Sequence, residues 1–139
     1  MAQEQENNSV PPKFKIGSDI CSIRRVEEVY DKYQERFLDR ILTASEKEYV
    51  LSRKKKADML ARLAGRFAAK EATSKVLGSG FIGVSWKEIE VLRLPSGEPR
   101  LKLSGKAEER ARELNLTHFE LTMSHERDYA VAFVLGYCH

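Results

Sequence analysis

The sequence predicts an α+β fold in which an antiparallel sheet packs against one long helix. Helical periodicity runs without a break through residues 56–77 and stops at Gly78. Strand-like alternation occurs at residues 14–20 and 118–124, and a nearly continuous apolar run at 129–135 suits a central strand. A length of 139 residues, of which 42% are hydrophobic, fits one domain with its own core.

The N-terminal residues 1–13 are polar and end in two prolines, so we expect a disordered tail before a single domain at 14–139. This end of the chain lacks the charged-then-apolar order of a signal peptide. No apolar run reaches the roughly 20 residues that a membrane-spanning helix needs. We therefore expect a cytoplasmic protein without a membrane partner.

The formal net charge of +3 is too small to demand a nucleic-acid partner. Basic residues nevertheless gather within residues 24–40 and form a run at 53–56. Such blocks suit an anionic partner, although a solvated charged face is the more common explanation. The two cysteines, Cys21 and Cys138, have no metal-ligand spacing, and we expect ordinary reduced thiols.

The first strand and the helix after it lie near the start of the domain. In an extended strand, alternation would put Gly17 and Asp19 on the face opposite Phe14, Ile16, Ser18 and Ile20. Ser22 is suited to cap the following helix. The inward stripe of that helix would consist of Ile23, Val26, Val29, Tyr30 and Tyr33.

The remaining elements are marked by local signals. Thr43-Ala44-Ser45-Glu46 has the capping-box pattern and predicts a second helix. Residues 86–94 read as a strand, 95–99 as a hairpin loop and 100–103 as the return strand. A charged amphipathic helix should occupy 106–114.

Glu71 is the residue of the long helix most informative about function. At about 100° per residue, Glu71 falls about 20° from Leu60, inside the apolar stripe. The same projection puts Arg66 on the opposite side or flank. A carboxylate in an apolar stripe is costly unless it is paired or binds a metal. The alternative is an internal ion pair of Glu71 with Lys75, four residues on, a spacing that favours such pairs. That alternative does not explain why the pair would lie on the inner face.

Two further polar residues stand at predicted strand ends. Asp19 could cap the next element or supply an oxygen ligand to a hard cation such as magnesium, together with Glu71. His125, in Ser124-His125-Glu126, could be a plain turn residue, contact a phosphate or transfer a proton. The sequence leaves both choices open.

Two segments together resemble the signatures of the phosphopantetheinyl transferases. The first is Ile16-Gly17-Ser18-Asp19-Ile20 followed by Arg25, and the second is Phe67-Ala68-Ala69-Lys70-Glu71-Ala72-Thr73-Ser74-Lys75. The stretches Ala64-Gly65-Arg66, Arg40-Ile41-Leu42-Thr43, Gly78-Ser79-Gly80 and Ser124-His125-Glu126 are similar to the small bacterial holo-acyl-carrier-protein synthases. The resemblance covers residues 13–135, with the motifs in the family's order.

The resemblance implies roles for particular residues. Asp19 and Glu71 would hold magnesium with the diphosphate of coenzyme A, and Lys75 would contact that phosphate during catalysis. Coenzyme A would also lie near Arg66, His125, Gly78 and Ser79. Arg25, with Arg24 beside it, would face an acidic acyl-carrier protein. The family also implies a homotrimer with an active site at each subunit boundary.

By the same resemblance, the reaction transfers 4′-phosphopantetheine from coenzyme A to a serine of the apo-carrier protein, with fatty-acid biosynthesis as the expected context. Two other functions stay open from the residues alone. A small magnesium-dependent phosphatase or nucleotide hydrolase would use the same carboxylates without a carrier protein. A nucleic-acid-binding module would use the basic region instead, although no recognition motif for RNA is present.

Overall fold

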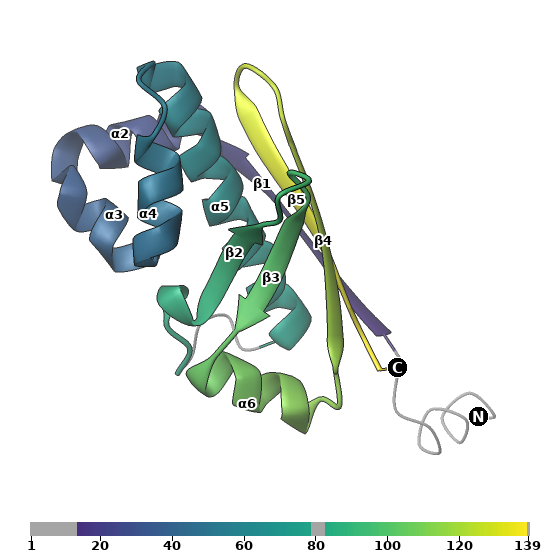
Figure 1. Cartoon of the computed structure of the whole chain (residues 1–139). Helices are drawn as coiled ribbons and strands as arrows, with labels where there is room; N and C mark the ends of the chain where they lie inside the picture. The colour runs from purple at the N-terminus through teal and green to yellow at the C-terminus, as the bar shows by residue number, and fades with distance from the viewer. Residues whose placement is uncertain (1–13, 79–82, 139) are drawn as a thin grey trace, which may run out of the picture.

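The computed structural model of the chain describes residues 14–78 and 83–138. The expected disordered tail at 1–13 lies outside the described residues, and the start of the domain at residue 14 stays a prediction. The expected α+β architecture, with an antiparallel sheet against a long helix, is confirmed (Figure 1).

The main sheet has three antiparallel strands in the order β1-β5-β4. These strands are β1 (Phe14–Ser22), β4 (His118–His125) and β5 (Tyr129–Tyr137). The apolar run expected to form a central strand does so, because β5 pairs with β1 on one side and β4 on the other. Ala132 of β5 lies opposite Asp19 of β1 and opposite Met123 of β4, so these three side chains share one face of the sheet.

The long helix α5 (Lys56–Leu77) packs across one face of this sheet, with the bounds that the sequence predicted. Gly17 lets the helix come close to β1: a Cβ atom there would lie 2.3 Å from the carbonyl oxygen of Ala72, far inside contact distance. Any larger residue at Gly17 would push α5 away from the strand. This close approach brings the end of β1 next to the C-terminal half of α5.

Three shorter helices follow β1 and lead into α5. They are α2 (Ile23–Tyr33), α3 (Glu35–Ile41) and α4 (Ala44–Leu51). Ser22 caps α2 through a 3.3 Å hydrogen bond from the Arg25 backbone N–H, and Thr43 with Glu46 forms the expected capping box of α4. Helix α3 was not predicted, because its seven residues are too few to show helical periodicity.

The inward stripe expected for α2 is wrong in part. Val26 is buried, whereas Val29 and Tyr33 are 37% and 43% exposed. Helix α2 contacts α5 along a narrow seam, so an amphipathic pattern in its sequence does not mean that every apolar residue is covered. The exposed part of the stripe forms one wall of a surface groove described below.

A separate two-stranded sheet and a last helix complete the fold. The region expected to be a strand begins instead as a short 3-10 helix, η1 (Trp86–Glu88), before β2 (Ile89–Arg93). The Ser85 cap, whose backbone N–H donates to Glu88 at 2.7 Å, favours that turn. Strand β2 pairs with β3 (Pro99–Leu103), and α6 (Gly105–Glu113) follows.

The face of the main sheet opposite α5 is apolar and uncovered. It carries the residues of β1 that the sequence placed on the face opposite Gly17 and Asp19, and it extends onto the central strand β5. The large apolar side chains exposed there are Phe14, Ile16, Ile20, Tyr129 and Phe133, each more than half exposed. We call this set the open sheet face. An apolar surface of this extent is typical of a binding surface.

Within the described residues, no helix combines the length and hydrophobicity needed to cross a membrane.

Candidate active site

The strand β1 and the helix α5 bring two carboxylates to one place. Asp19 points toward α5 because it shares the inner face of β1 with Gly17, and Glu71 lies on the turn of α5 that faces it. Both residues line one open pocket of about 380 Å³. We call Asp19, Glu71 and Lys75 the carboxylate site.

The environment of Glu71 disfavours its charge. Partial burial raises the pKa of this carboxyl group first of all, and the negative charge of Asp19 raises it further, while Lys75 acts in the opposite direction. Two carboxylates that repel each other in a pocket are a poor structural arrangement unless a cation sits between them. The site is therefore short of positive charge.

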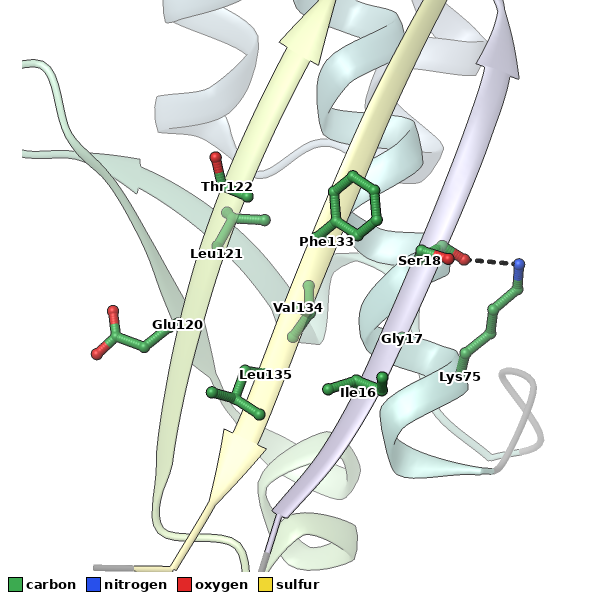
Figure 2. Close-up of a pocket in the computed structure, with 10 residues that line it drawn as sticks. All are labelled: Ile16, Gly17, Ser18, Lys75, Glu120, Leu121, Thr122, Phe133, Val134 and Leu135. Atoms are coloured by element: carbon green, nitrogen blue, oxygen red, sulfur yellow. Dashed lines mark hydrogen bonds between the residues drawn. The ribbon is translucent and has the colours of Figure 1, made fainter.

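Lys75 supplies part of that positive charge, because its side chain reaches from α5 to the edge strand β1. Its Nζ donates a hydrogen bond of 2.8 Å to the carbonyl oxygen of Ser18 (Figure 2) and lies 3.3 Å from Oδ1 of Asp19. The side chain is 55% exposed, whereas that of Asp19 is only 16% exposed. Lys75 thus pairs with Asp19 on the neighbouring strand, rather than with Glu71 on its own helix as one interpretation expected.

The carboxylate site fits a divalent cation such as magnesium. Asp19 and Glu71 offer hard oxygen donors, and magnesium is commonly held by one or two carboxylates together with water and substrate phosphates. In residues 14–78 and 83–138, no group of three or more His, Cys, Asp and Glu residues comes together as a self-sufficient metal site. A cation here would need oxygens from its substrate to complete its coordination.

Cys21 lines the same pocket but is not reactive there. Burial raises the pKa of its thiol to about 11, and the charges of Asp19 and Glu71 add to this effect. A thiol with such a pKa stays protonated at neutral pH and is a weak nucleophile and ligand. Cys21 and Cys138 are reduced thiols, as the sequence predicted.

A second group of predicted site residues gathers on a different side of α5. Arg66 and His125 line a pocket of about 370 Å³ with Arg53, Arg62 and Arg93. The guanidinium carbons of Arg62, Arg66 and Arg93 lie 3.8, 4.2 and 5.1 Å from the ring centre of Tyr49. We call this set the arginine pocket, and its charge suits a phosphate.

Arg66 is buried, although the helical projection places it on the side or flank away from the apolar stripe. Only 3% of the residue is exposed, because α4 and β2 cover this side of α5 as well. Burial lowers the pKa of its guanidinium to about 10, which leaves it charged at neutral pH. Among the described residues, its Nε is a buried side-chain nitrogen without a hydrogen-bond partner. An anion in the arginine pocket could accept from it.

Sequence reasoning missed three members of the arginine pocket. Tyr49, Arg62 and Arg93 carry no motif, and they come from α4, α5 and the end of β2. Only the arrangement of three arginines around one aromatic ring identifies them. The basic run at 53–56 was the one sequence signal, and Arg53 alone of that run lines the pocket.

The carboxylate site and the arginine pocket do not merge within one chain, since no residue lines both. Of the other residues expected near coenzyme A, Gly78 ends α5 in the left-handed conformation with φ of 72°. Ser79 lies outside the described residues. The roles predicted for Arg66, His125 and Gly78 stay predictions.

The two arginines expected to meet a carrier protein are exposed on α2. Arg25 lines the pocket of the carboxylate site, while Arg24 pairs with Glu28 at 3.5 Å on the outer side of the helix. Next to them lies a groove of about 880 Å³ with Val29, Phe37 and Trp86 in its walls and Arg36 and Arg40 at its rim. The groove adjoins the carboxylate pocket through Val29, Phe37 and Phe67, which line both.

Lys70, the residue before Glu71, is fully buried in a network of its own. Its Nζ donates to Oε1 of Glu46 at 2.8 Å, to the carbonyl oxygen of Trp86 at 3.1 Å and to that of Ile89. Glu46 in turn accepts from the backbone N–H groups of Thr43 and Val91, at 2.9 and 2.8 Å. Burial lowers the pKa of Lys70, and the charge of Glu46 opposes that effect.

Comparison with known proteins gives concordant results. Residues 15–134 match the model of the 4′-phosphopantetheinyl transferase superfamily. A holo-acyl-carrier-protein synthase of Gloeobacter violaceus is 42% identical over 120 residues, which cover 86% of this chain and 89% of the relative.

Solved structures agree with the sequence relatives. The holo-acyl-carrier-protein synthase of Neisseria meningitidis superposes with a TM-score of 0.79 at 33% identity, over 88% of this chain and 96% of that one. The Helicobacter pylori synthase, solved in complex with coenzyme A, gives a TM-score of 0.72 at 34% identity, over 87% and 98% of the two chains.

Proposed function

The chain belongs to the 4′-phosphopantetheinyl transferase superfamily, and on that premise we propose that it transfers 4′-phosphopantetheine from coenzyme A to a serine of apo-acyl-carrier protein. The products are holo-acyl-carrier protein and adenosine 3′,5′-bisphosphate. The observation that carries the proposal is the pairing of Asp19 with Glu71 in one pocket beside Lys75. We further propose fatty-acid biosynthesis in the cytoplasm as the setting.

Each residue of the carboxylate site has a defined task in this reaction. Asp19 and Glu71 would hold magnesium, which when bound would offset the negative charge of the coenzyme A diphosphate. Lys75 donates from Nζ to a phosphate oxygen and stabilises charge that develops on the leaving group. The serine oxygen forms a bond to the phosphorus that bears the pantetheine arm and gives up its proton to water. The bond from that phosphorus to the bridging oxygen breaks, and this oxygen leaves with adenosine 3′,5′-bisphosphate. Positioning and electrostatics carry such a transfer, without a covalent enzyme intermediate.

The arginine pocket suits the second anionic part of coenzyme A, its ribose phosphate. Arg62, Arg66 and Arg93 offer several N–H donors, and His125 stands at the mouth of the pocket. Since this pocket and the carboxylate site lie on different sides of α5, we propose that one coenzyme A binds between two copies of the chain.

The open sheet face favours assembly of several copies of the chain into an oligomer. Ile16 is 75% exposed and Phe133 is 54% exposed, at the centre of a face that water does not solvate well. We propose the homotrimer that family resemblance implies, with the open sheet faces of its chains covered by one another.

A complementation experiment tests the shared site. Asp19→Asn and Arg66→Gln should each be nearly inactive alone, but co-expressed chains with different tags should regain activity in mixed oligomers. The regain follows because such an oligomer contains boundaries at which both partners contribute intact residues. Mixed oligomers that are verified by mass and stay inactive would contradict a site shared between chains.

For carrier recognition, we propose that Arg25 and the adjoining groove receive an acidic, amphipathic segment of the carrier protein. The groove offers exposed apolar walls at Val29 and Tyr33, with Arg36 and Arg40 at the rim. Opposite charges at such a rim speed the encounter and fix its register more than they add affinity. Arg24 is less available because it pairs with Glu28.

Charge reversal tests this docking surface. Arg25→Glu should raise the KM for carrier protein by about tenfold and leave the KM for coenzyme A within about twofold. Lys102→Glu, on the distant β3 strand, is the matched control and should change neither value. Equal effects of the two variants would place docking elsewhere.

The activity itself is tested by incubation of the protein with coenzyme A, magnesium and an apo-acyl-carrier protein, read by mass spectrometry. The carrier should gain one phosphopantetheine group, and adenosine 3′,5′-bisphosphate should appear in equal amount. A chelator should prevent both. Phosphate release without modification of the carrier would indicate the phosphatase or hydrolase alternative instead.

A further inference from the structure

We propose that Lys75 occupies the cation position of Asp19 in the substrate-free protein, so that coenzyme A must draw Lys75 away before a divalent cation binds tightly. The inference rests on the proposed function and concerns the order in which the site is filled. It follows from where the ammonium group lies, which oxygens it contacts and how it enters the site.

The ammonium of Lys75 is held by two oxygens of the same strand. It donates to the carbonyl oxygen of Ser18 at 2.8 Å and lies 3.3 Å from Oδ1 of Asp19. A carbonyl and a carboxylate oxygen are also the donors that a hard cation prefers. The lysine thus uses the Asp19 oxygen that the divalent cation requires.

Helix geometry alone does not send Lys75 to this position. Glu71 lies four residues earlier on α5, the spacing that favours an ion pair along a helix. The ammonium instead reaches across to β1, as Figure 2 shows for its contact with Ser18. Lys75 therefore offsets the charge of Asp19 directly, while Arg25 lines the pocket that both carboxylates share.

A divalent cation and an ammonium group cannot share Asp19 without strong repulsion, because both would stand within a few ångströms of each other. Removal of Lys75 from Asp19 costs free energy, and in the absence of substrate nothing repays that cost. The phosphates of coenzyme A would offer Lys75 new acceptors next to Asp19, since lysine binds phosphate as a mobile point charge.

Lys75 can make this exchange without rearrangement of the fold. Its side chain is 55% exposed, so rotation about its stem bonds can move the ammonium away from Asp19 while the backbone stays in place. Coenzyme A and the cation should therefore strengthen each other's binding, and the coupling must be equal in both directions.

Titration of the full-length protein with Mn²⁺, followed by electron paramagnetic resonance of the free ion, tests the proposal. Without coenzyme A, Lys75→Met should bind Mn²⁺ about fivefold more tightly than the wild type. The increase in Mn²⁺ affinity caused by saturating coenzyme A should be smaller in Lys75→Met than in the wild type.

Arg25→Met is the matched control for loss of one positive charge, because Arg25 lines the pocket of Asp19 and Glu71. It should tighten Mn²⁺ binding by less than about twofold at moderate salt, where exposed charges are screened. The proposal is overturned if Lys75→Met leaves Mn²⁺ affinity unchanged, or if Arg25→Met has the same effect. If either variant gives such a result while the wild type still modifies carrier protein, only this inference is rejected. If the wild type does not modify carrier protein, the proposed function is rejected.

Discussion

Lys70 and Glu71 are neighbours on α5, and their surroundings differ in kind. Lys70 is fully buried and all three of its hydrogen bonds end on oxygens of the protein, one of them on Glu46. Glu71 is partly exposed, faces a second carboxylate and lies at an open pocket. The charge of Lys70 is neutralised by Glu46 within the fold, whereas neutralisation of Glu71 is left to a ligand of its pocket.

This contrast separates a charge that is balanced within the fold from one to which we assign a role in ligand binding. A buried pair whose polar atoms are all matched holds elements together, and here it joins α4, α5 and β2. A site that keeps like charges side by side sacrifices some stability and gains affinity for a ligand of opposite charge. Substitutions at Lys70, Asp19 and Glu71 test this difference between the two kinds of charge.

Lys70→Ala should have the largest effect, on stability. It leaves Glu46 charged in the core and two backbone carbonyl oxygens without their donor, which should lower the free energy of unfolding by about 3–5 kcal/mol. Urea denaturation measures the loss. The double variant Lys70→Met/Glu46→Leu should recover much of it, because no isolated charge remains. A loss below about 1 kcal/mol in the single variant would contradict a structural role.

Asp19→Asn and Glu71→Gln should have a large effect on activity instead. Each removes one of the two carboxylates that would hold the cation, and kcat/KM for carrier modification should fall by about 10²–10³-fold. Thermal unfolding of both variants should stay close to that of the wild type. Glu98→Gln, in the exposed turn between β2 and β3, is the control and should be fully active. Near-normal activity of either carboxylate variant at limiting magnesium would refute the metal assignment.

The smallest effect is the pH dependence of stability in Glu71→Gln. The raised pKa means that the folded protein holds the Glu71 proton more tightly than the unfolded chain, so ionisation at Glu71 reduces stability as pH rises above about 4.5. Without metal, Glu71→Gln should therefore be more stable than the wild type at pH 7, by less than about 1 kcal/mol because the group is partly exposed.

That advantage should disappear below pH 4, where Glu71 is protonated in both the folded and the unfolded protein. Unfolding temperatures of the two proteins across this range measure the difference. In saturating magnesium and coenzyme A at pH 7, the wild type should instead be more stable than Glu71→Gln, since only the wild type keeps both carboxylates. A stability difference that does not change with pH would show that neither burial nor the charge of Asp19 disfavours ionisation of Glu71.

The sequence by itself determined the elements whose signals are local. The bounds of α5, the Ser22 cap and the capping box of Thr43 depend on hydrogen bonds and periodicity within a few residues, and each was read correctly. The order of motifs around Asp19 and Glu71 likewise sufficed to indicate the family. Helix α3 and the 3-10 helix η1 were not predicted, because segments of seven and three residues carry too little periodic signal.

Only the tertiary structure decided which residues meet. The close approach of β1 and α5 at Gly17 places Asp19 beside Glu71 and within reach of Lys75, although helical spacing favoured Glu71 as the partner of that lysine. Coverage of α5 on a second side buries Arg66 against Tyr49 and separates the arginine pocket from the carboxylate site. Such contacts depend on packing between segments far apart in the chain, and no pattern within one segment encodes the distance between them.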